Sequence, residues 1–302
     1  METNEFLGAG LSYRRELNDG IFSAPDRVDF LELLTDQYMD MPPHKEEEAR
    51  FLGTQFPIVL HGVDLSIGTA GPIDKQYVEK MQQIAEWVKA RWVSDHLCFT
   101  RTRDLNIGQL TPLVFNEEIA SLTAANIAEV IRNFDCPFLV ENISYYFTIP
   151  SSTLSEAEFI TRVVRESGCW LLLDLANIQN NAINNHYDPF EFIDQIPLDR
   201  VIQIHLAGGY YHRGILLDTH SHPVPADVFD LLRYAVPQMP ALRGVIIERD
   251  QNYPPFSDLL SELDETRSIL ETHWAPRHSG QRSDPRPEVE RGSARALDAI
   301  TI

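Results

Sequence analysis

The chain has 302 residues, a formal net charge of −20 at pH 7, 43% hydrophobic residues and 23% charged residues. This composition is that of a globular protein, and an acidic balance without a basic patch disfavours nucleic acid as a partner. No apolar stretch approaches the roughly 20 residues of a membrane helix, and the first residues lack the basic flank and apolar core of a signal peptide. We therefore expect a cytoplasmic protein without a membrane partner. Its acidic surplus belongs either to a solvated surface or to a carboxylate cluster neutralised by cations.

Eight short apolar segments, separated by longer amphipathic ones, run along the chain. Runs of this length that end in loops are typical of buried parallel strands. The strands are predicted at 7–13, 28–34, 56–61, 91–97, 137–142, 170–175, 201–206 and 244–249.

Helix signals occupy the gaps between these strands. They are an apolar stripe at helical spacing, a polar residue suited to cap the first turn, or a first-turn proline. Helices are predicted over 73–90, from the cap Asn116 to Arg132, after the capping box of Ser155 and Glu158, after Asp188-Pro189, and over 225–235 and 257–272.

The alternation of strand and helix predicts a (β/α)8 TIM barrel formed by residues 1–275. A doubly wound open sheet is the alternative, but it would normally place a glycine-rich phosphate turn after the first strand, and GAGLSY lacks that spacing. Long loops are expected at 98–114 and 207–224, where a barrel carries its function. Residues 276–302 are rich in Pro, Arg and Ser and are predicted to form a disordered tail.

Seven of the predicted strands end on an acid or a histidine. In a barrel the carboxyl ends of the strands converge on one face, so these side chains would meet. A single such residue is usually solvated or satisfied by backbone amides, but several carboxylates buried together without a cation would repel one another. A mixed set of nitrogen and oxygen ligands suits iron, manganese or zinc. The strand-end residues are Glu32, His61, Asp95, His96, Glu141, Asp174, His205 and Glu248.

The loop after the seventh strand adds Asp218, His220 and His222 at alternate positions. On an extended segment Asp218 and His220 face the same way and would hold one ion together; an exposed polar loop is the alternative. Asn177, three residues after Asp174, would reach the same mouth. So many ligands exceed what one metal needs, and they predict two or three ions that share bridging carboxylates.

Eight motifs follow one another along the chain: HGVDLSIG (61–68), VSDHL (93–97), LVENIS (139–144), SEAEF (155–159), LLLDLAN (171–177), HLAGG (205–209), LLDTHSHPVP (216–225) and IIERD (246–250). In this order they resemble the MbnB/TglH/ChrH family. That family groups the methanobactin-biosynthesis iron enzyme with relatives that modify cysteines in ribosomally made peptides. The resemblance extends from about Gly8 to Leu270, so the tail lies outside it.

The resemblance implies a xylose-isomerase-like TIM barrel that holds two or three iron ions in mixed Fe2+ and Fe3+ states. It also implies O2-dependent oxidation of a cysteine in a precursor peptide, usually with a small partner protein that forms a heterodimer and presents the peptide. Glu141 and Glu248 would be bridging carboxylates, and Asn177, Asp218 and His220 would form a peripheral third site. The implied ligands are His61, His96, Glu141, Asp174, Asn177, His205, Asp218, His220 and Glu248.

Five further residues are candidates for other roles. Asp64 stands where the family more usually has a small residue, and His222 is an additional histidine, so both are candidates for contact with substrate. A loop is expected at NNAINNHYDP that places His186 near the mouth, where it either contacts substrate or is an ordinary turn residue. Asp95 and Asp250 are candidate catalytic bases beside the ligands.

Two other classes of function remain open. Sugar isomerases and barrel endonucleases also place Glu, Asp and His at successive strand ends, so a redox-neutral hydrolase or isomerase with zinc or manganese is the alternative. A non-catalytic metal-binding protein is the third class, although so many convergent ligands would be costly to maintain for scaffolding alone. The identity of the bound metal and a requirement for O2 would separate these classes.

Overall fold

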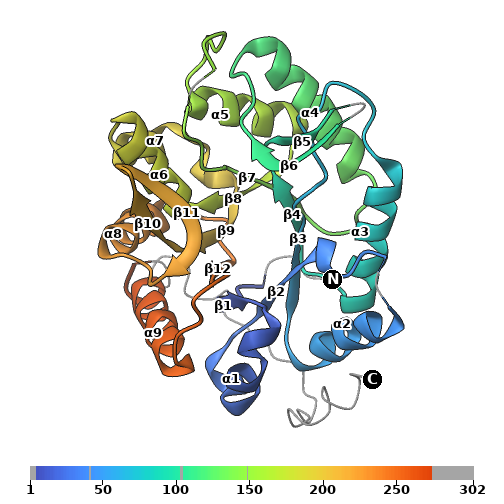
Figure 1. Cartoon of the computed structure of the whole chain (residues 1–302), viewed down its shortest axis with the longest axis vertical. Helices are drawn as coiled ribbons and strands as arrows, with labels where there is room; N and C mark the ends of the chain where they lie inside the picture. Colours follow the sequence, from blue (N-terminus) through green and yellow to red (C-terminus); the bar gives the residue numbers. More distant parts are fainter. Residues whose placement is uncertain (1–4, 41, 103–104, 148, 274–302) are drawn as a thin grey trace.

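The computed structural model of the chain describes residues 5–40, 42–102, 105–147 and 149–273. Eight parallel strands close into a barrel in the order β1, β12, β9, β8, β7, β4, β3, β2, and helices surround it (Figure 1). The predicted TIM barrel is confirmed, whereas the predicted tail at 276–302 lies outside the described residues. The barrel strands are β1 Gly8–Ser12, β2 Leu31–Leu34, β3 Ile58–His61, β4 Val93–His96, β7 Phe138–Glu141, β8 Trp170–Asp174, β9 Val201–Leu206 and β12 Gly244–Ile247.

The helices begin where the capping residues predict. The Asn116 side chain accepts a hydrogen bond from the backbone N–H of Ile119 (2.8 Å), and Ser155 and Glu158 form a reciprocal capping box. No helix among the described residues is long and apolar enough to cross a membrane. The α-helices are α1 Asn18–Ser23, α2 Pro43–Gln55, α3 Lys75–Val88, α4 Glu117–Ile131, α5 Glu156–Ser167, α6 Leu175–Asn185, α7 Pro189–Gln195, α8 Ala226–Ala235 and α9 Phe256–His273.

The barrel interior has an apolar floor beneath the strand ends. Alternate side chains of a strand face the same way, so the residue two positions before each inward-facing strand end also points inward. Gly10 and Gly244 leave room for the Phe30 ring there, because a Cβ on either would lie within 2.8 Å of that ring. The floor is a separate buried cluster of Leu7, Phe30, Val59, Trp92, Leu139, Leu172, Ile202 and Ile246.

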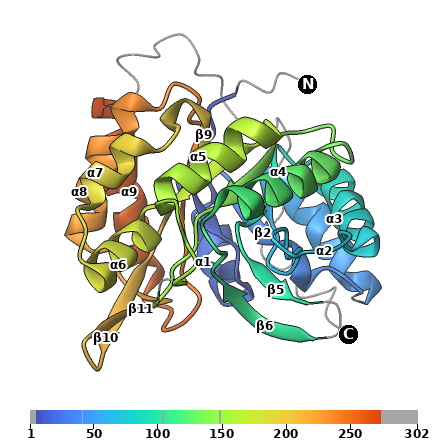
Figure 2. The ribbon, with the colours of Figure 1, turned by 90° about the horizontal axis from the view of Figure 1, so that it is seen from above.

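The two long segments predicted as loops are β-hairpins. Strands β5 (Phe99–Arg101) and β6 (Asn106–Thr111) pair with each other, as do β10 (Gly208–His212) and β11 (Ile215–His222). Both hairpins project from the same side of the barrel (Figure 2). Between β10 and β11, Arg213 and Gly214 have φ of 50° and 86°, as a two-residue type I′ turn requires. The prediction of loops was wrong here, because these strands pair only with each other and carry no core-type apolar run.

Candidate metal centre

Six side chains converge at the carboxyl end of the barrel. Each lies within one residue of the end of a strand and faces the interior, because the residue two positions earlier belongs to the floor or, before His96 and His205, lines the same interior. All six are buried, with at most 9% of their surface exposed. They are His61 of β3, His96 of β4, Glu141 of β7, Asp174 of β8, His205 of β9 and Glu248 after β12.

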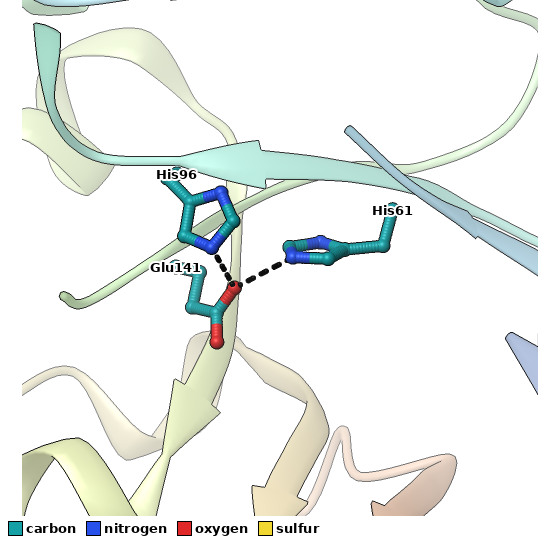
Figure 3. Close-up of side chains that lie close together, drawn as sticks. All are labelled: His61, His96 and Glu141. Atoms are coloured by element: carbon teal, nitrogen blue, oxygen red, sulfur yellow. Dashed lines mark ion pairs between the residues drawn. The ribbon is translucent and has the colours of Figure 1, made fainter. Parts of the chain in front are cut away.

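Glu141 lies between two groups of potential ligands. Its Oε2 is 3.1 Å from His61 Nε2 and 3.3 Å from His96 Nε2, so both rings point at one oxygen (Figure 3). Its Oε1 is 3.1 Å from His205 Nδ1. The ligand atoms of His61, His96 and Glu141 lie within 4.8 Å of one another, as do those of Glu141, Asp174, His205 and Glu248. A carboxylate that bridges two cations needs this arrangement.

The hydrogen bonds of His61 and His96 direct their Nε2 atoms at Glu141. The Ser94 hydroxyl donates to the Leu60 carbonyl (3.1 Å), so it accepts from His61 Nδ1 at 2.9 Å. His96 Nδ1 lies 3.2 Å from the Gly62 carbonyl oxygen, which can only accept. In their neutral forms, with the proton on Nδ1, both rings would offer their Nε2 lone pairs to a cation held by the Glu141 oxygen. Because Glu141 Oε2 is buried without a hydrogen-bond partner, a cation fits between these three atoms.

The second group surrounds His205 Nδ1. This nitrogen lies 3.1 Å from Glu141 Oε1 and 3.1 Å from Glu248 Oε2. Asp174 Oδ1 accepts from the backbone N–H of Asn177 (2.7 Å) at the start of α6, whereas Asp174 Oδ2 is buried without a partner. Burial, followed by Glu141 and Asp218, raises the pKa of Asp174 well above its usual range. Three carboxylates around one imidazole need positive charge, which protons supply in a metal-free chain and a cation would supply instead.

The third group lies on β11, further out. His220 Nε2 is 2.8 Å from Asp218 Oδ1, so these two potential ligand atoms converge. His220 Nδ1 lies 3.4 Å from Glu248 Oε2, which connects this group to the second. Asn177 donates its amide to the Asn142 carbonyl (3.1 Å), and its buried Oδ1 has no partner. The structure thus brings Asp218 and His220 together and leaves an unused oxygen on Asn177.

The histidine pKa values record the charge of the cluster. Burial alone would lower the pKa of His61, but Glu141 outweighs it and raises that pKa to about 9. Carboxylates likewise raise the pKa values of His205 and His220, against burial. For His96 burial dominates and lowers the pKa to about 4. In the metal-free chain the carboxylates therefore favour the doubly protonated form of His61, His205 and His220, with positive charge at positions where cations would lie.

The two candidate bases lie in different places. Asp250 Oδ2 is 3.1 Å from His220 Nδ1, and the other oxygen pairs with Arg14, so Asp250 lies beside the cluster and partly in solvent. Asp95 lies on the opposite face of β4 from His96, because neighbouring strand residues alternate. It contacts Tyr77 of α3 and the Leu65 amide (each 3.4 Å), and burial raises its pKa to about 8. The structure gives Asp95 no contact with a ligand atom.

None of the three candidate substrate residues touches the cluster. Asp64 accepts hydrogen bonds from Thr100 and from Asn106 (3.2 Å), which attaches the segment after β3 to the β5–β6 hairpin. His186 is exposed at the end of α6, about 16 Å from its start at 1.5 Å per residue, and the predicted loop before it is helical. His222 is exposed against the Tyr210 ring, 5.6 Å between centroids.

Glu32, Gln203 and Arg14 also contact the predicted ligand set. Glu32, one of the strand-end acids, lies behind His205, with Oε2 2.9 Å from His205 Nε2. Gln203 donates to the same Glu32 oxygen (2.5 Å), and strand alternation from His205 could have placed it in the interior. Arg14 is buried, pairs with Asp250 and lies 3.9 Å from Glu248 Oε1. Nothing in its local sequence marks Arg14, because its acidic partners Glu248 and Asp250 are more than 200 residues away.

The chain is similar to curated relatives in sequence and to solved structures in fold. A Caulobacter vibrioides protein named UPF0276 protein is 37% identical over 256 residues, covering 84% of this chain and 89% of the relative. The fold is similar to that of endonuclease IV from Thermus thermophilus (TM-score 0.57, 17% identity, 88% and 99% of the two chains). It is also similar to D-psicose 3-epimerase from Clostridium cellulolyticum (TM-score 0.56, 10% identity, 91% and 100%). At these identities the two structures show the fold alone.

The family model described as "RiPP precursor modification enzyme MbnB/TglH/ChrH" matches residues 8–271. That range contains the whole barrel and every ligand discussed above. The resemblance that the motifs carry is therefore confirmed: the chain belongs to the MbnB/TglH/ChrH family of enzymes that modify the precursors of ribosomally made peptides.

Proposed function

We propose that this chain is a multinuclear non-haem iron enzyme that uses O2 to modify a cysteine of a ribosomally made precursor peptide. The observation that carries the proposal is Glu141, whose two oxygens face two separate groups of ligand atoms. One shared carboxylate between two mixed nitrogen and oxygen groups suits a pair of iron ions, and Asp218 with His220 suits a third. We further propose that two or three ions are bound, as Fe2+ and Fe3+.

Bound iron would supply a site for the cysteine thiolate and the electron transfer that O2 chemistry needs. The chain's residues would hold that site rigid, because His61, His96 and Glu141 are buried and held by strand ends. Asp250 reaches solvent beside His220, and we assign its Oδ2 to accept the proton of the substrate thiol. The hairpins flank the mouth and would separate the reacting sulfur from bulk water (Figure 2).

Exposed apolar side chains on the mouth side support a peptide substrate or a protein partner. They lie on three segments that follow β4, β7 and β9, where solvent-exposed aromatic rings are otherwise unfavourable. We propose that this rim receives the precursor peptide and a small partner protein in the cytoplasm, without nucleic acid or membrane. The residues are Leu105, Ile107, Tyr146, Phe147, Tyr210, Tyr211 and Ile215.

The test is metal content and Mössbauer spectroscopy on protein purified without oxygen from iron-replete cells. We expect two or three irons per chain and spin-coupled signals. Addition of a cysteine-containing precursor peptide encoded beside this chain should then give O2 consumption and a mass change confined to cysteine. Glu141→Gln should abolish both the O2 consumption and the mass change. Glu156→Gln is the matched control, because Glu156 is a buried carboxyl of α5 that is bonded to Tyr145. Bound iron that supports no O2-dependent change in the peptide would contradict the proposal.

A redox-neutral hydrolase or isomerase is the second candidate. The observation that favours it is the donor set, because imidazole and carboxylate also suit zinc and manganese. Protein that retains zinc or manganese in iron-replete cells and turns over without O2 would establish this candidate in place of the first.

A further inference from the structure

Glu32 is a buried carboxylate that the proposed metal chemistry does not use directly. It lies inside the barrel on β2, fully buried, and its Oε2 accepts from Gln203 Nε2 (2.5 Å). The same oxygen is 2.9 Å from His205 Nε2, on the side of the ring away from Glu141 and Glu248. Glu32 therefore contacts the back of a ligand rather than the space where a cation would lie.

The orientation of this contact is set from deeper in the barrel. The indole N–H of Trp92 can only donate, and it donates to Gln203 Oε1. This bond fixes the Gln203 amide so that its NH2 group faces Glu32. Trp92, Gln203 and Glu32 are all buried, so no solvent competes for these bonds. The Glu32 side chain is consequently held with its Oε2 next to His205 Nε2.

Glu32 determines which ring nitrogen of His205 is available to a cation. A histidine that binds a metal through Nδ1 carries its proton on Nε2, and a carboxylate behind it orients the ring and strengthens the donor nitrogen. His205 Nδ1 lies 3.1 Å from both Glu141 and Glu248, so it is the ligand atom. With that proton on Nε2, Glu32 Oε2 accepts from His205 Nε2–H and from Gln203 Nε2, and the two nitrogens lie 2.7 Å apart.

The other three histidines of the cluster have different supports. His61 donates to the Ser94 hydroxyl and His96 to a backbone carbonyl, both of which are neutral. His220 faces Asp250, but Arg14 neutralises that carboxylate. Among these four histidines, only His205 is supported by a fully buried carboxylate, Glu32. Apart from His205 itself, the hydrogen-bond donor to Glu32 is the neutral amide of Gln203.

We propose that Glu32, held by Gln203 and Trp92, is a positioning residue that secures the cation shared by Glu141, Asp174, His205 and Glu248. This inference rests on the metal binding of the proposed function but not on its oxygen chemistry. Loss of a supporting group of this kind typically weakens metal affinity about 10–100-fold. The loss should affect one bound ion, because the other groups do not contact Glu32.

The test is a competition titration of the full, metal-depleted chain with Co2+ against a chromophoric chelator. Glu32→Gln keeps the volume and one acceptor oxygen but removes the charge. We expect one Co2+ equivalent to bind about 10–100-fold more weakly, with the remaining equivalents and their visible absorption unchanged. Glu32→Asp keeps the charge and should recover part of the affinity. Glu156→Gln, equally conservative and buried outside the cluster, should bind as wild type does.

The outcomes separate the two proposals. Wild type that binds no Co2+ would overturn the metal-based function and this inference together. Glu32→Gln with wild-type affinity at every equivalent would overturn only the role of Glu32. The same holds if all equivalents weaken alike, because that indicates a general structural defect. Unfolding curves of the metal-free variants check that they fold. If Glu32→Gln does not fold, Glu32→Asp is tested in its place.

Discussion

In the metal-free chain, a rise in pH should lower the free energy of unfolding, because His61 then loses the proton that pairs it with Glu141. His61 Nε2 lies 3.1 Å from Glu141 Oε2, and this carboxylate raises the histidine pKa to about 9, against the effect of burial. In the unfolded chain the pKa returns to about 6.5. Because the folded pKa is the higher one, the stabilisation is fully present below pH 6.5 and is lost as pH rises through 9.

The size of the loss follows from the two pKa values. A difference between about 9 and 6.5 corresponds to about 3 kcal/mol of unfolding free energy, a large part of a typical domain's stability. The assay is denaturant unfolding of chelator-treated protein at pH 6 and pH 9.5, for wild type and for His61→Gln. More distant titrating groups contribute to both proteins, so the difference between the two pH dependences reports the His61–Glu141 pair.

Metal-loaded protein is the control, because a cation at His61 Nε2 takes the place of the proton and should remove this pH dependence. An equal loss of stability in wild type and His61→Gln would refute the reasoning. So would a metal-free chain that is as stable at pH 9.5 as at pH 6.

Three further predictions concern separate parts of the molecule. Glu141→Gln should lower metal content by two equivalents and Asp218→Asn by one, because Glu141 belongs to two groups of ligands and Asp218 to one. Elemental analysis measures the metal content, and equal losses in the two variants would contradict the shared role of Glu141. Leu172→Ala in the barrel floor should destabilise the fold by about 2–5 kcal/mol in chemical denaturation, and a change under 1 kcal/mol would show that the floor is not close-packed. Ser155→Ala should cost about 1 kcal/mol through its lost cap, with metal content unchanged.

The prediction that acids and histidines at strand ends converge in the barrel is correct where one such residue ends a strand. It is wrong for one residue of a pair where two such residues are adjacent. Asp95 and His96 are consecutive, so a strand can turn only one of them inward. Trp92 in the floor and Ser94 both face the interior, so alternation along the strand turns His96 inward and Asp95 outward. Counting back from the strand end would have excluded Asp95 from the mouth. His186 was misplaced for another reason: an asparagine-rich segment has low helix propensity, and tertiary contacts made it helical.

The sequence by itself determined the barrel and the inward direction of His61, Glu141 and Glu248, because strand periodicity and strand length are local properties. Only the tertiary structure decided which atoms meet. Glu32 on β2 reaches His205 on β9 because barrel closure brings together positions 173 residues apart, and Arg14 meets Asp250 for the same reason. Strand order and stagger set these contacts, and they arise from packing of the whole chain, which no local pattern records.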